Sequence, residues 1–180
     1  MNEADTCREY VVPGLVAAGW DVAPHSIAEQ RIFTDGRVFV VRGKVKRGKQ
    51  KKADYLLRYT RDFPISVVEA KADYKRPGDG LGQAKDYAQT LDIKFAYATN
   101  GTGIIEFDFL TGTESVLSAF PTPVELWQRF AKSSHVSGAQ TGQLLEGFNL
   151  QSGKVPRYYQ GIATPGITTT CTSSPASRKF

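Results

Sequence analysis

The clearest pattern of hydrophobic and polar positions lies in the middle of the chain, where two apolar segments are bounded by charged residues. Residues 65–71 are rich in β-branched side chains and begin directly after Pro64, which predicts a buried strand. Because side chains alternate between faces along a strand, Glu69 and Lys71 share one face of it. A second strand is predicted over 53–59. The residues between the two strands leave room for a turn and an antiparallel return.

Periodicity and turn residues predict further elements on both sides of these strands. Residues 2–18 carry apolar side chains at helical spacing and are followed by Gly19, a typical helix stop. Pro13 lies inside this helix, removes one backbone donor and predicts a kink. The remaining predicted elements are strands over 37–41, 95–99 and 104–109 and helices over 81–91 and 123–130. The order of helix, three strands, helix and two strands predicts an α/β sheet with helices on its faces.

Length and composition indicate one globular domain of about 130–160 residues followed by a tail. Hydrophobic residues make up 41% of the chain and charged residues 23%, yet no apolar stretch approaches the ~20 residues of a membrane helix. The N-terminus lacks the features of a signal peptide, and Cys7 and Cys171 lie at opposite ends of the chain. We therefore expect a cytoplasmic protein that contacts no membrane.

The net charge of +5 is concentrated in residues 42–52, here called the basic segment. A solvated hairpin loop and a loop that follows DNA phosphates explain this charge about equally well. The position of the segment directly before Asp54 makes it a candidate DNA-binding element. The candidate DNA-binding residues are Lys46, Arg47, Lys49, Lys51 and Lys52.

Asp54 opens the first central strand, and the Glu69-Ala70-Lys71 triplet closes the second. About ten residues further on, Gln83 and Tyr87 are four residues apart on one helix face. This set resembles the motif of PD-(D/E)xK nucleases, including the Q-x3-Y element of their RecB-like branch. The flanking segments NEADTCREYVVPGLVAAGW, PHSIAEQR, FAYATNG, IIEFDF and FPTPVELWQRF resemble the N-terminal nuclease domain of the R (motor) subunit of type I restriction enzymes. The resemblance implies a restriction-endonuclease-like α/β core, with a mixed central sheet flanked by helices.

The resemblance also implies the chemistry of the site. Asp54, Glu69 and the backbone carbonyl of Ala70 would hold Mg²⁺, for which Mn²⁺ can substitute, since hard cations prefer oxygen ligands. Lys71 would orient the attacking water and stabilise the transition state, while Gln83 and Tyr87 would help to hold the scissile strand. The simpler alternatives are a structural Glu69–Lys71 ion pair and ordinary packing of Gln83 and Tyr87.

Glu3 lies on the buried side of the first predicted helix and is a further candidate metal ligand. Its alternative role is a favourable interaction with the helix dipole in the first turn. The sequence supports the interaction with the helix dipole at least as well as metal ligation.

The sequence divides into a nuclease domain over 1–150, a connector over 151–160 and a tail over 161–180 that is expected to be disordered. Arg157–Gln160 resembles the start of a helicase Q motif. In the family, ATP drives translocation along double-stranded DNA, and methyltransferase and specificity subunits complete the complex. ATP would therefore serve the full-length family member, and no cofactor-binding residue for it is expected here. Two rival functions are a stand-alone RecB-like nuclease and a catalytically silent module that binds DNA or docks in the complex.

Overall fold

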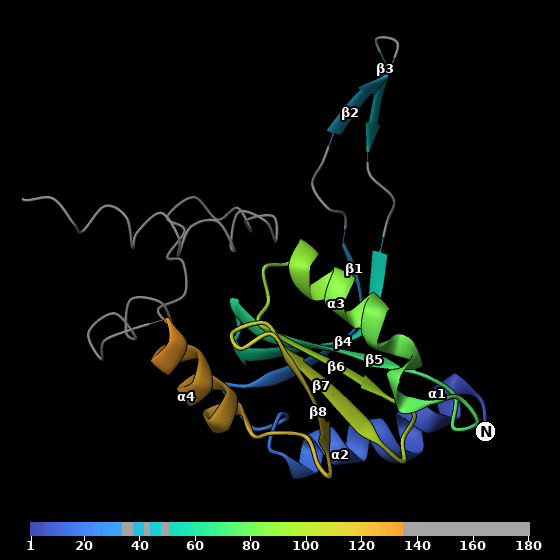
Figure 1. Ribbon diagram of the computed structural model, residues 1–180, viewed down its shortest axis with the longest axis vertical. Helices are drawn as coiled ribbons and strands as arrows, with labels where there is room; N and C mark the ends of the chain where they lie inside the picture. Colours follow the sequence, from blue (N-terminus) through green and yellow to red (C-terminus); the bar gives the residue numbers. More distant parts are fainter. Residues whose placement is uncertain (34–37, 42–43, 48–50, 135–180) are drawn as a thin grey trace, which may run out of the picture.

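The computed structural model describes residues 1–33, 38–41, 44–47 and 51–134, and its centre is a six-stranded mixed sheet (Figure 1). The strands occur in the spatial order β1 (Ser26–Phe33), β4 (Lys51–Thr60), β5 (Phe63–Ala70), β6 (Phe95–Thr99), β7 (Ile104–Asp108) and β8 (Thr113–Leu117). Only β5 and β6 run parallel; all other neighbours are antiparallel. The parallel pair requires a crossover connection, and helix α3 (Leu81–Thr90) supplies it.

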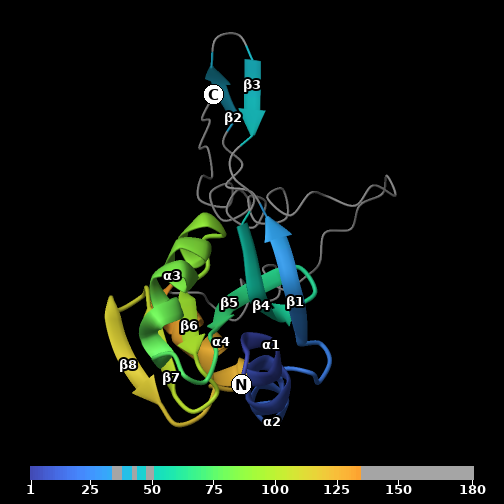
Figure 2. The same ribbon diagram turned by 90° about the vertical axis from the view of Figure 1, so that its right-hand side faces the viewer.

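Helices cover both faces of the sheet, as Figure 2 shows when the sheet is seen from its side. The N-terminal helical segment consists of α1 (Glu3–Thr6), a π-helical segment (Cys7–Val11) and α2 (Val12–Ala17). On the opposite face lies α3 (Leu81–Thr90), which follows a short 3₁₀ helix at Pro77–Gly80. The last described helix is α4 (Pro123–Ser133), which begins with a capping box between Thr122 and Glu125.

Two apolar clusters hold the layers together. One lies between the sheet and the N-terminal helix and α4, where Leu15, Trp20 and Leu126 are fully buried. The other lies between the sheet and α3, where Ala84 and Ala88 pack on Val67. Strand β5 is buried from Ile65 to Ala70 because both clusters use it, as expected for a central strand covered on both faces. The predicted buried strand and its position at the centre of the sheet are confirmed.

The predicted kink at Pro13 takes a specific form. A proline ring inside an α-helix clashes with the carbonyl four residues earlier and cannot donate a hydrogen bond. Here the helix widens into the π-helical segment Cys7–Val11 immediately before Pro13, and α-helical geometry resumes with the proline in its first turn. Gly19 then ends the helix with φ +86°, a left-handed conformation that favours glycine.

The predicted order of strands is wrong in three places. Strands β1 and β8 were not predicted, and the basic segment contains β3 (Lys44–Arg47), which pairs with β2 (Val38–Val41) as a separate two-stranded hairpin. Both β1 and β8 are edge strands, and each exposes an apolar side chain, Ile32 on β1 and Val116 on β8, so hydrophobicity does not mark a buried face in either. In Figure 1 the β2–β3 hairpin stands off from the six-stranded sheet.

The other predictions for the central part of the chain are confirmed within one or two residues, including α3, β6 and β7. The predicted connector and tail, residues 151–180, lie outside the described residues. Among the helices described, none is long and apolar enough to cross a membrane.

Candidate active site

The candidate site lies at the carboxyl end of β5, where the adjacent strand β4 carries Asp54. The antiparallel register places Tyr55 opposite Val68, so that Asp54 and Glu69 come opposite each other one residue further along. The Ala70 amide donates a hydrogen bond of 2.9 Å to Asp54 Oδ2. This bond fixes one carboxylate oxygen of Asp54 against the backbone of the Glu69-Ala70-Lys71 triplet.

Glu69 is the most buried charged group of the site, with 2% of its surface exposed. Its Oε1 accepts a hydrogen bond of 2.7 Å from Lys71 Nζ. Its Oε2 is buried and has no hydrogen-bond partner among the described residues. A buried carboxylate oxygen without a donor is unfavourable, and a metal ion, a water molecule or protonation of the carboxyl relieves this cost.

The electrostatics of the site follow from this burial. Desolvation raises the pKa of Glu69 to about 7; the Lys71 hydrogen bond lowers it, and the charge of Asp54 raises it further. Burial by itself would lower the pKa of Lys71, but the hydrogen bond from Lys71 to Glu69 and the nearby carboxylates raise it above its usual value. Lys71 is therefore a fixed positive charge at neutral pH, whereas the charge of Glu69 depends on what lies beside it.

Helix α3 brings two more predicted residues to the same place. Gln83 Oε1 accepts a hydrogen bond of 3.3 Å from Lys71 Nζ, and Gln83 Nε2 donates one of 2.5 Å to the Tyr87 hydroxyl. Desolvation raises the pKa of Tyr87, and Gln83 lowers it in part. The structure thus joins Glu69, Lys71, Gln83 and Tyr87 in one hydrogen-bonded chain. The roles of these residues in catalysis stay predictions.

Gly80 is a site residue that the sequence analysis did not single out. A Cβ atom at Gly80 would lie 3.0 Å from Glu69 Cγ and 3.3 Å from Lys71 Cε. Only glycine therefore lets the turn before α3 approach the two charged side chains so closely. The PGDG sequence of the turn, directly before the helix that carries Gln83, is the signal that could have identified it.

Glu3 was predicted on the buried side of its helix, but it is exposed, because the buried side of α1 is at Thr6. Glu3 lies near the site and does not complete a cluster of metal ligands. Its carboxylate is close enough to raise the pKa values of Glu69 and Lys71. Within residues 1–33, 38–41, 44–47 and 51–134, no three His, Cys, Asp or Glu side chains are grouped as a metal site. The predicted donor set of Asp54, Glu69 and the Ala70 carbonyl contains only two such side chains. It fits a hard cation through its oxygen chemistry and the unpartnered Oε2 of Glu69.

The candidate DNA-binding residues of the basic segment have different environments. Lys46 and Arg47 lie in β3, and Lys49 lies outside the described residues. Lys51 forms an ion pair of 2.6 Å with Asp86 and donates to Thr90, so it also fastens β4 to α3. Lys52 is exposed. The structure leaves the predicted contact with DNA untested.

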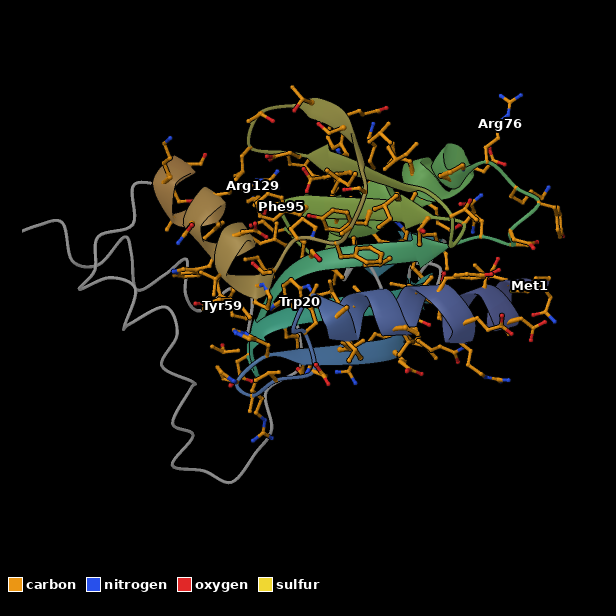
Figure 3. The ribbon with its side chains drawn as sticks, turned by 90° about the horizontal axis from the view of Figure 1, so that it is seen from below. Met1, Trp20, Tyr59, Arg76, Phe95 and Arg129 are labelled. Carbon is orange, nitrogen blue, oxygen red and sulfur yellow. The ribbon has the colours of Figure 1, made fainter. Side chains whose placement is uncertain are left out.

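A second charged cluster, away from the site, was not predicted. Arg129 on α4 donates two hydrogen bonds to Glu106, of 2.9 and 2.7 Å, and one of 2.7 Å to Asp108. Tyr97 also donates to Glu106, and the Arg129 guanidinium lies over the Phe95 ring. Figure 3 shows Arg129 near Phe95, on the side of the molecule opposite Arg76. The cluster attaches α4 to the sheet, and all its carboxylates are paired.

The fold and the site together define a restriction-endonuclease-like α/β protein, with a mixed sheet flanked by helices and a pair of carboxylates beside a lysine at the end of a central strand. The chain is 50% identical to the solved structure of a fragment assigned to the HsdR subunit of a type I restriction enzyme from Vibrio vulnificus YJ016. The two structures agree with a TM-score of 0.83 over 96% of this chain and 33% of that one.

A curated relative gives the same result. The chain is 38% identical over 169 residues, or 89% of its length, to the type I restriction enzyme EcoAI endonuclease subunit of Escherichia coli. The protein is therefore a homologue of the endonuclease (HsdR) subunit of type I restriction enzymes. It corresponds to only 20% of the length of the Escherichia coli subunit.

A further match is more distant. Over 107 residues, or 59% of its length, the chain is 28% identical to a DNA ligase of Endomicrobium trichonymphae, of which it covers 15%. No family model matches the chain.

Proposed function

We propose that this chain is a Mg²⁺-dependent DNA endonuclease domain of the PD-(D/E)xK type, which hydrolyses phosphodiesters without sequence specificity of its own. The observation that supports this most is the environment of buried Glu69. Its Oε1 accepts a hydrogen bond from Lys71, while its Oε2 has no donor among the described residues. Asp54 lies opposite Glu69 on the neighbouring strand. The second Glu69 oxygen, Oε2, is therefore open to a metal ion. Homology to a restriction endonuclease subunit supports the same reaction class.

The metal would be held by Asp54, Glu69 and the Ala70 carbonyl. When bound, Mg²⁺ would lower the pKa of a water molecule and neutralise charge on the phosphoryl oxygens. A cation beside Glu69 would also stabilise the ionised carboxylate, whose pKa burial raises to about 7. The hydrogen bond from the Ala70 amide holds Asp54 in place before any metal arrives.

Lys71 has the geometry of a positioning and charge-stabilising group. Its ammonium group is held between Glu69 Oε1 and Gln83 Oε1 and is a fixed cation at neutral pH. An ammonium group can donate three hydrogen bonds, so the third remains for a water molecule or a phosphoryl oxygen. Gln83 and Tyr87 would then fix Lys71 and contact the scissile strand. Positioned charge of this kind contributes most of the rate enhancement in phosphoryl chemistry.

We propose further that the domain acts on double-stranded DNA within a type I restriction complex that also contains methyltransferase and specificity subunits. In the whole subunit, ATP-driven translocation would precede cleavage. The basic segment would follow the DNA phosphates through charge alone, which gives no sequence specificity. We place the protein in the cytoplasm, where its DNA substrate would be found.

The test is cleavage of supercoiled plasmid DNA by the 180-residue chain in Mg²⁺ or Mn²⁺. We expect nicked and linear products with the wild type and none with Lys71→Ala, provided that circular dichroism shows the variant to be folded, since the change removes the cation paired with buried Glu69. Lys132→Ala, which removes an exposed lysine on α4, is the matched control and should cleave like the wild type. Equal cleavage by Lys71→Ala and the wild type would refute the assignment of the site.

A different outcome would favour the catalytically silent module. If the wild type bound DNA but no divalent metal, and cleaved nothing, the fold would serve docking rather than catalysis. Metal binding therefore separates these two functions where weak cleavage would not.

A further inference from the structure

The segment that connects the two site-bearing elements has an unusual surface. Between β5, which ends before Lys71, and the turn at Gly80 lies the segment Asp73–Arg76, here called the tyrosine loop. Its Tyr74 side chain is 76% exposed, one of the highest values for a large apolar side chain in the described part of the chain. Lys75 and Arg76 are also exposed, and neither forms an ion pair with a described carboxylate.

The backbone of the tyrosine loop is held firmly although its side chains are exposed. Asn100 is 5% exposed and donates hydrogen bonds from Nδ2 to the carbonyls of Asp73 and Lys75. The Lys75 amide donates to the Ala72 carbonyl, and the Arg76 amide donates to Asp79 Oδ2. The loop is therefore ordered by its backbone, and its exposed side chains are not needed for that order.

The other end of the Asn100 side chain, its Oδ1 atom, holds the asparagine in place. Its Oδ1 accepts hydrogen bonds from the amides of Thr102 and Gly103 and from the Thr102 hydroxyl. A buried asparagine that uses both ends of its amide in this way joins the β6–β7 turn to the tyrosine loop. The negative charge of Asp73 is compensated by the N-terminal ammonium group at 3.1 Å.

The tyrosine loop lies close to the site. Tyr74 is three residues from Lys71, so their Cα atoms are at most about 11 Å apart. That distance corresponds to only a few nucleotides of a DNA strand. Figure 3 shows the Arg76 side chain pointing away from the fold, at the same end of the molecule as Met1.

We propose that the tyrosine loop binds an unpaired stretch of DNA strand next to the cleavage site, with the Tyr74 ring stacked on a base and Lys75 and Arg76 bound to phosphates. This inference rests on the proposed nuclease function. An exposed aromatic ring followed by two cations is the combination that binds single strands without reading their sequence. Within a duplex both faces of a base are covered by its neighbours, so Tyr74 requires an unpaired base or a strand end. The Lys75 ammonium group, 5.8 Å from the centre of the Tyr74 ring, would reach the phosphate beside the stacked base.

The test measures binding of a fluorescent 20-nucleotide oligo(dT), and of a duplex of equal length, to the 180-residue chain without divalent metal. Tyr74→Ala should weaken oligo(dT) binding about tenfold, the effect of losing one stacked base, and Tyr74→Phe should bind within twofold of the wild type. Duplex binding should change less than threefold in both variants. Val116→Ala, which removes an exposed side chain on β8, is the control and should bind oligo(dT) normally.

The charge of the loop gives an independent readout. Changing Lys75 and Arg76 together to alanine should reduce the slope of log K against log salt for oligo(dT) by about 1.4, since each phosphate contact to a single strand contributes about 0.7. Lys132→Ala should leave the slope unchanged, because α4 lies at the other end of the molecule (Figure 3).

The inference is overturned if Tyr74→Ala binds oligo(dT) like the wild type, or if Tyr74→Phe loses as much affinity as Tyr74→Ala. If either result is found while plasmid cleavage still depends on Lys71, the proposed function is supported and only this inference is wrong. A wild type that neither binds oligo(dT) nor cleaves plasmid removes both. Wild-type cleavage without oligo(dT) binding also removes the inference alone.

Discussion

Replacing Glu69 by Gln keeps the shape of the side chain and removes the charge that burial makes unfavourable. The folded state raises the pKa of Glu69 from an ordinary 4.5 to about 7 through desolvation, so the folded protein holds this proton more tightly than the unfolded chain. A raised carboxyl pKa means that stability is lost as the pH rises from about 4.5 to about 7. In Glu69→Gln this loss is absent.

The size of the effect follows from the two pKa values. Between pH 5 and pH 8 the ionisation of Glu69 should lower the free energy of unfolding by roughly 2–3 kcal/mol in the absence of divalent metal. Lys71 does not titrate in this interval, because the Glu69 hydrogen bond and the nearby carboxylates raise its pKa against the opposing effect of burial. The loss should therefore be confined to the pH range in which Glu69 ionises.

The assay is urea unfolding of both proteins in EDTA at pH 5 and pH 8. The fall in unfolding free energy between the two pH values should be larger in the wild type than in Glu69→Gln by this amount. Other titrating groups cancel in the comparison. An equal fall in both proteins would show that Glu69 ionises as in water, and would refute the inference that burial raises its pKa and leaves Oε2 open to a cation.

Three further predictions concern other parts of the structure. Gly80→Ala should reduce plasmid cleavage at least tenfold with little change in Tm, because the added Cβ would displace Glu69 and Lys71. Gly82→Ala is the control and should cleave normally, because a Cβ at Gly82 would have no heavy atom within 4 Å. Arg129→Ala should lower the free energy of unfolding in urea by about 3 kcal/mol, because it leaves two buried carboxylates without their cation; an effect below 1 kcal/mol would contradict this reading. Neutralising the basic residues at 46, 47, 49 and 51 should weaken binding to every duplex about equally. The slope of log K against log salt should fall by roughly one unit per lost phosphate contact, and an unchanged slope would indicate a solvated segment.

The sequence was sufficient to predict the centre of the fold because that part follows simple rules. Residues 65–70 form a buried strand, and the side chains of Glu69 and Lys71, two residues apart, are joined by a hydrogen bond. The four-residue spacing of Gln83 and Tyr87 predicts a shared helix face, and the two side chains are hydrogen-bonded. Local periodicity determines these relations, so they can be inferred without knowledge of the tertiary structure.

Relations that depend on tertiary contact could not be predicted in this way. The hydrogen bond from Ala70 to Asp54 depends on the register of β4 against β5. The contact of Gly80 with Glu69 depends on how closely α3 approaches the sheet. Glu106 and Asp108 are two residues apart and share one face of β7. Their pairing with Arg129 depends on where α4 packs against the sheet, which the sequence does not show. Edge strands β1 and β8 were missed because their apolar residues do not mark a buried face: Ile32 and Val116 are exposed, and β8 is exposed over most of its length.

The central claim is that Asp54 and Glu69 together hold a divalent metal ion, and calorimetric titration with Mn²⁺ and Mg²⁺ at pH 8 tests it most directly. We predict one site in the wild type, no measurable binding in Asp54→Ala or Glu69→Ala, and an unchanged fold in both variants by circular dichroism. Asp92→Ala, which removes an exposed carboxylate paired with Lys94 away from the site, is the control and should bind metal like the wild type. Undiminished metal affinity in both site variants would contradict the claim.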